Sequence, residues 1–325
     1  MINIALVGLG YWGKNYLRVL RSIHDASLIY VCDLIEESSK LLPQGIKFTS
    51  DYEELAQKNE INAAIISTPA STHYEIARKF LESGKDVLVE KPLTMASGEA
   101  VDLIKIAKEN KRILMVGHIY CYHPAVRYLR RMIINKKAGK IFYGMALRMG
   151  LGPIRNDASC TWDLATHDIA ILDYIFKQKP NYVTATATSF LQKDKQVYDY
   201  AHIYLEYENM HFSLTSSWYS AEKIRSLWIE GSRYLIKFDD MNKDWPIMIY
   251  RSNLINIKEQ SDYKGTIFMP RIPKDEPLLV QTRHFVECVR LRKKPLTDGY
   301  QGLSVIEILE AAERAIKQGK KVKLK

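Results

Sequence analysis

Three glycines near the N-terminus, Gly8, Gly10 and Gly13, constrain this chain more than any other feature. The apolar run over residues 1–7 precedes them, as in a strand buried on both faces, and a helical pattern over residues 14–21 follows. The first glycine allows a tight turn, the second lets the backbone approach a ligand, and the third lets the helix pack close to the strand. The pattern predicts a helix N-terminus that presents its N–H groups to a phosphate.

An acidic residue completes this pattern. A second apolar run, Leu28–Cys32, ends on Asp33, which lies 33 − 13 = 20 residues beyond Gly13. A carboxylate at this place accepts hydrogen bonds from the adenosine ribose hydroxyls of a dinucleotide. It would repel a 2′-phosphate, and Leu-Ile-Glu rather than Arg or Lys follows it, so the sequence predicts NAD rather than NADP. The glycines alone would also fit a strand–helix turn with no ligand.

Strands and helices continue to alternate as far as residue 117. Helices are expected over residues 36–41, from 50, over 73–83 and over 96–110, and strands over 45–49, 63–67, 86–89 and 113–117. Alternation of this kind predicts a parallel, doubly wound sheet with ligands at the carboxyl ends of its strands. We therefore expect an α/β Rossmann domain that binds NAD, over residues 1–118.

The pattern changes after residue 118. Helices are expected over residues 124–135, 162–176, 278–291 and 302–317, and strands over 140–149, 182–188, 200–207, 211–217, 225–230, 234–238 and 248–251. Residues 258–275 are less regular. Consecutive strands with short links predict an α+β domain with a large, mostly antiparallel open sheet over residues 119–325. A sheet face rich in Tyr and Trp would suit self-association, so we expect a homodimer or homotetramer.

Composition narrows the classes of protein. The 325 residues carry a net charge of +10, but the Lys and Arg residues are spread along the chain without a nucleic-acid motif. A positive potential would attract an anionic small molecule instead. No apolar run reaches membrane-spanning length, and the N-terminus reads as a strand rather than a signal peptide. With four widely spaced cysteines, this favours a cytoplasmic protein that contacts neither nucleic acid nor membrane.

Glu90 and Lys91 end the fifth expected strand and precede Pro92. A lysine at that edge could reach a cofactor ribose and a substrate hydroxyl, and partial desolvation beside a cation would lower its pKa enough to exchange a proton. The alternative is an ordinary turn.

Asp163 and His167 are four residues apart on an expected helix, so both side chains project from one face. A carboxylate beside an imidazole can bind a polyol and pass a proton. The alternative is a pair that only stabilises the helix. No further ligands at suggestive spacing accompany them, so we expect no metal.

Residues 117–124 bring polar and aromatic groups to the expected domain junction. His118, Tyr120 and Tyr122 would suit the stacking and hydrogen bonds of a sugar site, and would equally suit a packed hinge.

Taken together, these motifs resemble the glucose–fructose oxidoreductase / inositol dehydrogenase family, often called Gfo/Idh/MocA. The resemblance covers nearly the whole chain and depends most on Glu-Lys-Pro at residues 90–92 together with Asp-x-x-x-His at 163–167. It implies an NAD-dependent dehydrogenase in which Lys91, Asp163 and His167 line the active site. Ala165 stands where the family commonly has Gly, and Cys121 where many members have Arg. The residues expected at the cofactor are Gly8, Gly10, Tyr11, Trp12, Gly13, Asp33, Thr68, Pro69, His73, Glu90 and Lys91.

The segment Arg148–Arg155 is similar to members that act on nucleotide-linked amino sugars. That likeness implies a UDP-N-acetylhexosamine or uronate 3-dehydrogenase, with His118, Tyr120, Tyr122, Arg148, Asp163 and His167 as substrate contacts. An inositol or free-sugar dehydrogenase remains open, as does a regulatory protein that binds NAD without catalysing a reaction.

Overall fold

The protein, described here by a computed structural model over residues 1–152, 154, 158–191, 197–251 and 266–324, divides into two units. The first unit consists of Met1–Tyr122 and Asp275–Ile306, and the second of His123–Lys274 and Glu307–Lys325. The chain first passes from one unit to the other between Tyr122 and His123, close to the boundary expected after residue 118. Asp275–Ile306, which the sequence assigned to the second domain, packs with the first unit instead.

The first unit is built on a six-stranded parallel sheet in the order β3-β2-β1-β4-β5-β6. This is the predicted Rossmann arrangement, and the strand order reverses between β1 and β4. All residues of β4 and β5 are buried, as the continuous apolar runs predict for strands covered on both faces. The strands are β1 (Ile2–Val7), β2 (Ala26–Cys32), β3 (Lys47–Thr49), β4 (Ala63–Ile66), β5 (Asp86–Glu90) and β6 (Leu114–Gly117).

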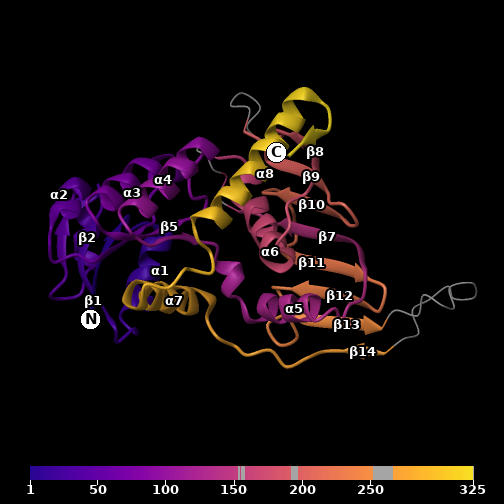
Figure 1. Ribbon diagram of the computed structural model, residues 1–325, viewed down its shortest axis with the longest axis horizontal. Coiled ribbons are helices and arrows are strands. Elements are labelled where there is room, and N and C mark those ends of the chain that lie inside the picture. The colour runs from indigo at the N-terminus through magenta and orange to yellow at the C-terminus, as the bar shows by residue number, and fades with distance from the viewer. Residues whose placement is uncertain (153, 155–157, 192–196, 252–265, 325) are drawn as a thin grey trace, which may run out of the picture. The chain divides into compact units, whose positions relative to one another are not determined.

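Helices cover both faces of this sheet (Figure 1). Along one face lie α2 (Tyr52–Gln57), α3 (His73–Glu82) and α4 (Ser97–Glu109), and along the other α1 (Tyr11–Leu20) and α7 (Pro277–Leu291). Short helices η1 (Glu36–Leu41), η2 (Ala70–Thr72) and η3 (Ile119–Tyr122) complete the connections. The predicted start of α2 is confirmed, because the Asp51 carboxylate accepts hydrogen bonds from the N–H groups of Glu53 and Glu54 at 2.8 and 3.2 Å.

Polar contacts hold the segment Asp275–Ile306 to the rest of the first unit. Thr297 donates a hydrogen bond to the Val116 carbonyl at 2.7 Å, and Arg292 pairs with the buried Asp86 at 2.6 Å. An amphipathic helix pattern shows which face is apolar but not which sheet it covers, so the sequence could not assign α7 to this unit.

The second unit contains a nine-stranded sheet in the order β14-β13-β12-β11-β7-β10-β9-β8-β15. It is mostly antiparallel, as predicted, with one parallel pair between β7 and β10. The strands are β7 (Ile141–Met149), β8 (Tyr182–Thr188), β9 (Tyr200–Glu206), β10 (His211–Ser217), β11 (Ile224–Gly231), β12 (Tyr234–Asp239), β13 (Ile247–Arg251), β14 (Ile267–Phe268) and β15 (Val322–Lys323). The last two were not predicted, because two residues carry no readable alternation. Part of the irregular stretch 258–275 lies outside the described residues.

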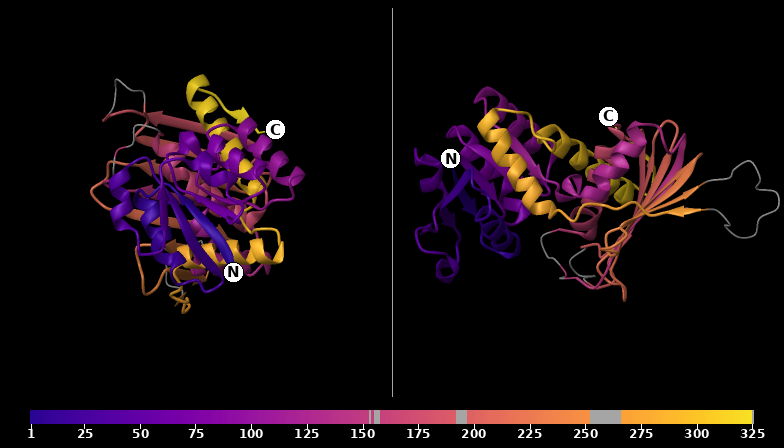
Figure 2. Two further views of the ribbon diagram at one scale, coloured as in Figure 1. Left: turned by 90° about the vertical axis from the view of Figure 1, so that its left-hand side faces the viewer. Right: turned by 90° about the horizontal axis from the view of Figure 1, so that it is seen from below.

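The second unit's helices lie on one face of this sheet, as its edge-on view shows (Figure 2). They are α5 (Pro124–Ile134) and α6 (Thr166–Phe176), the latter preceded by η4 (Thr161–Ala165). Helix α8 (Gly299–Gln318) begins earlier than expected and continues from one unit into the other. Over the described part of the chain, no helix is both long and apolar enough to cross a membrane.

Candidate active site

The glycine turn has the geometry that its sequence predicts. Gly8 has φ +92°, and a Cβ there would lie 2.8 Å from Ser67. A Cβ on Gly13 would lie 2.0 Å from the Gly8 carbonyl oxygen. Gly10 differs from both, because a Cβ there would meet no atom within 4 Å, and no side chain caps the helix that it begins. The open space at Gly10 and the N–H groups of α1 therefore fit a pyrophosphate.

Asp33 lies beside this turn. One carboxylate oxygen accepts a hydrogen bond from Leu9 N–H at 2.6 Å, and the other accepts one from Ile35 N–H at 2.9 Å. The carboxylate is thereby held at the carboxyl end of β2, where acceptors for ribose hydroxyls are needed. These residues fit NAD.

The contrast between the glycines gives a first prediction. Gly10→Ala should lower the melting temperature by only a few degrees, the cost of alanine at this helix N-cap. It should weaken NAD binding about tenfold or more, because the new methyl group would occupy the space proposed for the phosphates. Gly13→Ala should lower both the melting temperature and the affinity for NAD, because its Cβ would overlap the backbone and overpacking costs about 1–3 kcal/mol. Calorimetric titration with NAD and thermal melting check the pair. Unchanged NAD affinity in Gly10→Ala would contradict this placement of the pyrophosphate.

His73 connects two loops at the carboxyl edge of the first sheet. Its ring is buried, with Nδ1 2.7 Å from the Pro92 carbonyl oxygen and Nε2 3.0 Å from that of Thr68. Thr68 and Pro69 follow β4, and Pro92 follows β5. His73, which the family resemblance placed at the cofactor, thus holds together the loops that could contact it.

Glu90 is buried at the end of β5, where it accepts a hydrogen bond from the Tyr16 hydroxyl at 2.6 Å and one from Lys91 N–H at 3.1 Å. Gln281 of α7 donates to the same tyrosine oxygen at 2.8 Å. Gly117 is opposite, and a Cβ there would lie 2.8 Å from the Glu90 carboxylate. The carboxylate is therefore enclosed by the fold, and fixes the backbone that carries Lys91.

Burial raises the pKa of Glu90 above its ordinary value of 4.5, against the opposing effect of the Tyr16 hydrogen bond and the Lys91 charge. The folded state then holds this proton more tightly than the unfolded chain does, so the stabilisation is present at acid pH and declines as the pH rises. Glu90→Gln keeps the acceptor without the ionisation. The melting temperature of Glu90→Gln minus that of the wild type should increase by about 3 °C or more from about pH 4.5 to about pH 8. Melting curves that stay parallel would show that Glu90 ionises without cost.

Lys91 and His118 lie at neighbouring strand ends of the same unit. His118 is 1% exposed, and its pKa falls to about 3, first because of burial and second because of the Lys91 charge. The imidazole is therefore neutral, with one donor and one acceptor nitrogen. Neither nitrogen has a hydrogen-bond partner among the described residues. A hydroxyl can accept from the protonated nitrogen or donate to the other, so one ligand hydroxyl would pair with one of the two.

The two tyrosines of the same stretch differ from this histidine. Tyr122 is fully buried, and its hydroxyl lies 3.1 Å from the Thr297 hydroxyl. Burial also raises the pKa of Tyr122. Tyr120 is buried as well. For Tyr122, which we expected to contact substrate, the contacts show packing within the first unit.

The second unit contributes Asp163 and His167 from the segment where η4 leads into α6. The first turn is a π-helix rather than the expected α-helix, and Thr166 N–H donates to the Thr161 carbonyl five residues before it. Both candidate side chains are half-buried. Trp162, which precedes Asp163, and Ala165, which lies between the two candidates in the chain, are buried. π-Helical turns are frequent at functional sites, and here the turn presents a carboxylate and an imidazole.

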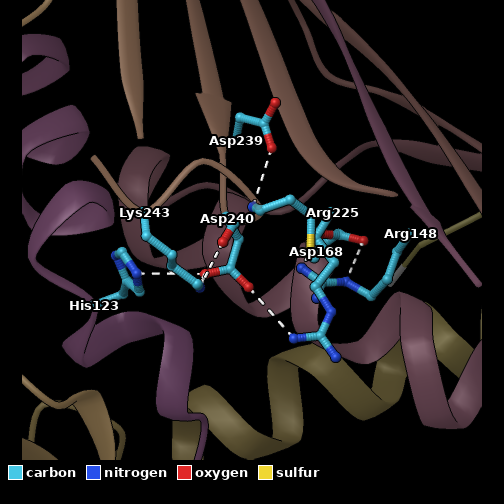
Figure 3. A network of polar contacts seen from close by, with 8 residues as sticks. His123, Arg148, Asp168, Arg225, Asp239, Asp240 and Lys243 are labelled. Atoms are coloured by element: carbon cyan, nitrogen blue, oxygen red, sulfur yellow. Dashed lines mark hydrogen bonds and ion pairs between the residues drawn. The ribbon is translucent and has the colours of Figure 1, made fainter. Parts of the chain in front are cut away.

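Arg148 of β7 forms a buried ion pair with Asp168, the residue after His167 (Figure 3). Arg148 Nε and Nη2 donate to the two carboxylate oxygens at 3.0 and 2.7 Å, and the two side chains are 5% and 3% exposed. A bidentate pair of this kind is directional as well as strong. The pair fixes the first turn of α6 to the sheet. It also gives an intramolecular partner to Arg148, which the resemblance named as a substrate contact.

A second polar cluster lies beside this pair, around Asp240 (Figure 3). Its carboxylate lies 3.4 Å from Arg225 and Lys243 and 3.5 Å from His123 Nε2. The other ring nitrogen of His123 accepts the N–H of Ala125 and so caps α5. The cluster joins the end of β12 to the start of α5.

Several residues that shape the site carried no sequence signal. Tyr16, Gln281 and Trp218 are separated from the motifs in the chain or belong to apolar patterns. Asp168, the charged residue next to His167, could have been noticed in the sequence as a possible partner for a buried cation.

Family models match both units. The model for the NAD-binding Rossmann fold of the Gfo/Idh/MocA oxidoreductase family matches residues 2–118, and the model for the C-terminal α/β domain of the same family matches residues 159–324. The protein is therefore an oxidoreductase with an NAD-binding Rossmann domain. It belongs to the Gfo/Idh/MocA family.

Individual relatives span the chain to different extents. A scyllo-inositol 2-dehydrogenase (NAD⁺) from Bacillus subtilis is 25% identical over 99% of this chain and 96% of its own. A UDP-N-acetylglucosamine 3-dehydrogenase from Acidithiobacillus ferrooxidans is 34% identical, over 40% of this chain and 41% of its own. A solved structure of a UDP-N-acetylglucosamine 3-dehydrogenase from Acidithiobacillus ferrooxidans has a TM-score of 0.85, at 23% identity and with 98% of each chain covered, so it shares the fold.

Proposed function

We propose that this oxidoreductase is a nucleotide-sugar dehydrogenase that oxidises a ring hydroxyl, of the UDP-N-acetylhexosamine or uronate 3-dehydrogenase type. The observation that carries the catalytic part is the presence of Lys91 at the carboxyl end of β5, near His118. The His118 imidazole is neutral and has no hydrogen-bond partner within the described part of the chain. Polar groups at that edge are where a parallel sheet binds its ligands.

The chain's own residues have separate roles in this proposal. Lys91 or His167 takes the proton of the substrate hydroxyl, Asp163 orients the sugar, and His118 hydrogen-bonds a second hydroxyl. Bound NAD supplies the hydride acceptor. Arg148 and Tyr122 act through the parts they hold in place, because each already has an intramolecular partner.

Two observations favour a nucleotide sugar over a free one. The net charge of +10 suits an anionic substrate such as a diphosphate. The local identity to a UDP-N-acetylglucosamine dehydrogenase, 34%, exceeds the 25% to the inositol dehydrogenase. The second value, however, extends over 99% of the chain. An inositol or free-sugar dehydrogenase is therefore the second candidate.

A substrate panel separates the candidates. NADH formation at 340 nm should be fastest with UDP-N-acetylglucosamine or its uronate, and at least about tenfold slower with N-acetylglucosamine and myo-inositol. Faster turnover of myo-inositol would favour the second candidate. If NAD binds but no sugar reduces it, the protein is better explained as a regulator.

We also propose that the uncovered face of the large sheet joins copies of this chain. Tyr143, Met145 and Tyr204 are 52%, 39% and 36% exposed there, and the rings of Trp228 and Tyr250 stack 6.4 Å apart. Aromatic and Met side chains are typical of such interfaces. Light scattering should give the mass of a dimer or tetramer, and Tyr143→Glu with Met145→Glu should lower it. A mass of 37.5 kDa for the unchanged protein would contradict self-association.

A further inference from the structure

Two strands of the large sheet provide hydrogen-bond donors to the carboxylates on either side of His167. Trp218, directly after β10, donates its indole N–H to Asp163 at 3.1 Å. Arg148 of β7 holds Asp168. Strands β7 and β10 are neighbours, with Arg148 beside Ser216 and Met149 beside Ser217, so both donors lie at the same end of the sheet.

Trp218 is itself held firmly. It is 3% exposed and packs in a small cluster with Cys160 and Ala201. Its backbone N–H donates to the Asp199 carbonyl at 3.0 Å. An indole is a donor only, and this one has a fixed position. It can therefore set the orientation of a carboxylate without exchanging a proton with it.

The position of helix α6 does not depend on the contact between Trp218 and Asp163, because the Arg148–Asp168 pair holds it. Because that pair anchors the first turn of α6 through two hydrogen bonds, losing the indole donor would leave the helix in place. The Asp163 carboxylate, which is half-buried, would then lose one of the contacts that fix its orientation. A change of this kind would affect the orientation of the substrate rather than the fold.

We propose that Trp218 is a positioning residue for catalysis, whose indole N–H holds the Asp163 carboxylate in the orientation that serves the substrate at His167. This rests on the proposed function. The contact that carries it is the hydrogen bond from Nε1 to Asp163.

Trp162 offers a matched control. It is buried to a similar degree, precedes Asp163 in the chain, and donates its indole N–H at 2.6 Å to Glu313 instead. Trp218→Phe and Trp162→Phe therefore remove the same atoms from the same region, but only the first removes the donor to Asp163. Each lost hydrogen bond to a charged group is expected to matter about 10- to 100-fold where it serves the reaction.

In the experiment, kcat, KM and NAD affinity are measured for both variants. Trp218→Phe should lower kcat about 10- to 100-fold with NAD affinity unchanged, because the indole donor to Asp163 is lost while the anchor of α6 remains. Trp162→Phe should leave kcat within about twofold of the wild type. Equal kcat values in the two variants would overturn the proposal.

A readout without turnover keeps this test apart from the proposed function. With ¹⁵N-labelled tryptophan, the indole signal that disappears in Trp218→Phe should shift in Asp163→Asn, whereas the signal of Trp162 should not. An unshifted Trp218 signal would overturn the contact. If the wild type turns over no sugar, the proposed function fails and the indole signals alone decide whether Trp218 holds Asp163.

Discussion

Lys91→Met should lower kcat by about a thousandfold and leave the affinity for NAD within a few-fold of the wild-type value. General acid–base catalysis contributes about 10²–10⁴-fold, and methionine keeps the length and apolar stem of the side chain without its amine. In the proposed site the pyrophosphate and ribose of NAD contact the glycine turn and Asp33, which the substitution does not touch. Steady-state NADH formation and calorimetric titration with NAD measure the two quantities.

Lys85 provides the control, because it precedes the same strand at the opposite edge of the sheet. Its ammonium group donates to the Lys58 carbonyl at 2.8 Å. Lys85→Met should cost about 1 kcal/mol of stability through this lost hydrogen bond and leave kcat unchanged. Unchanged kcat in Lys91→Met would remove that amine from the mechanism, and an equal loss in both variants would show that the effect is structural.

His167→Asn should lower kcat by roughly 10²–10³-fold, because the amide occupies a similar volume but cannot take a proton. Since Arg148 and Asp168 fix the turn that carries it, the variant should fold and bind NAD normally. The measurement is again kcat beside NAD affinity, with thermal melting as the check on folding. His24→Asn, at an exposed position of the first unit, should change none of these.

A kcat for His167→Asn that stays close to the wild-type value would leave Lys91 as the sole proton acceptor. In that case His167 would have at most a binding role, visible as a higher KM.

The parts of the site that could be predicted from the sequence are those with a local pattern. The glycine turn, Asp33 and the strand ending in Glu90-Lys91 each belong to one short stretch, whose hydrophobic run fixes the fold around it. The Asp51 cap and most strands of the second sheet were readable for the same reason. These features need no knowledge of what packs against them.

The parts that could not be predicted depend on contacts between distant residues. The resemblance gave Arg148 as a substrate contact, and the structure pairs it with Asp168, 20 residues away. Tyr16 reads as one apolar position on a helix, and its hydroxyl meets Glu90, 74 residues away. The π-helical turn before α6 also escaped prediction, because its residues keep the spacing of an α-helix over so short a length.

The proposal that Lys91 or His167 takes the proton of one substrate hydroxyl is tested most directly by single-turnover kinetics. NADH formation is followed after mixing NAD-loaded enzyme with the preferred sugar, for Lys91→Met, His167→Asn and the double variant. If the two groups act on one hydroxyl, the double variant should be no more than about threefold slower than the slower single variant, since groups that act as a unit are not additive. If the two losses multiply, the groups act in independent steps, and a shared proton transfer is contradicted.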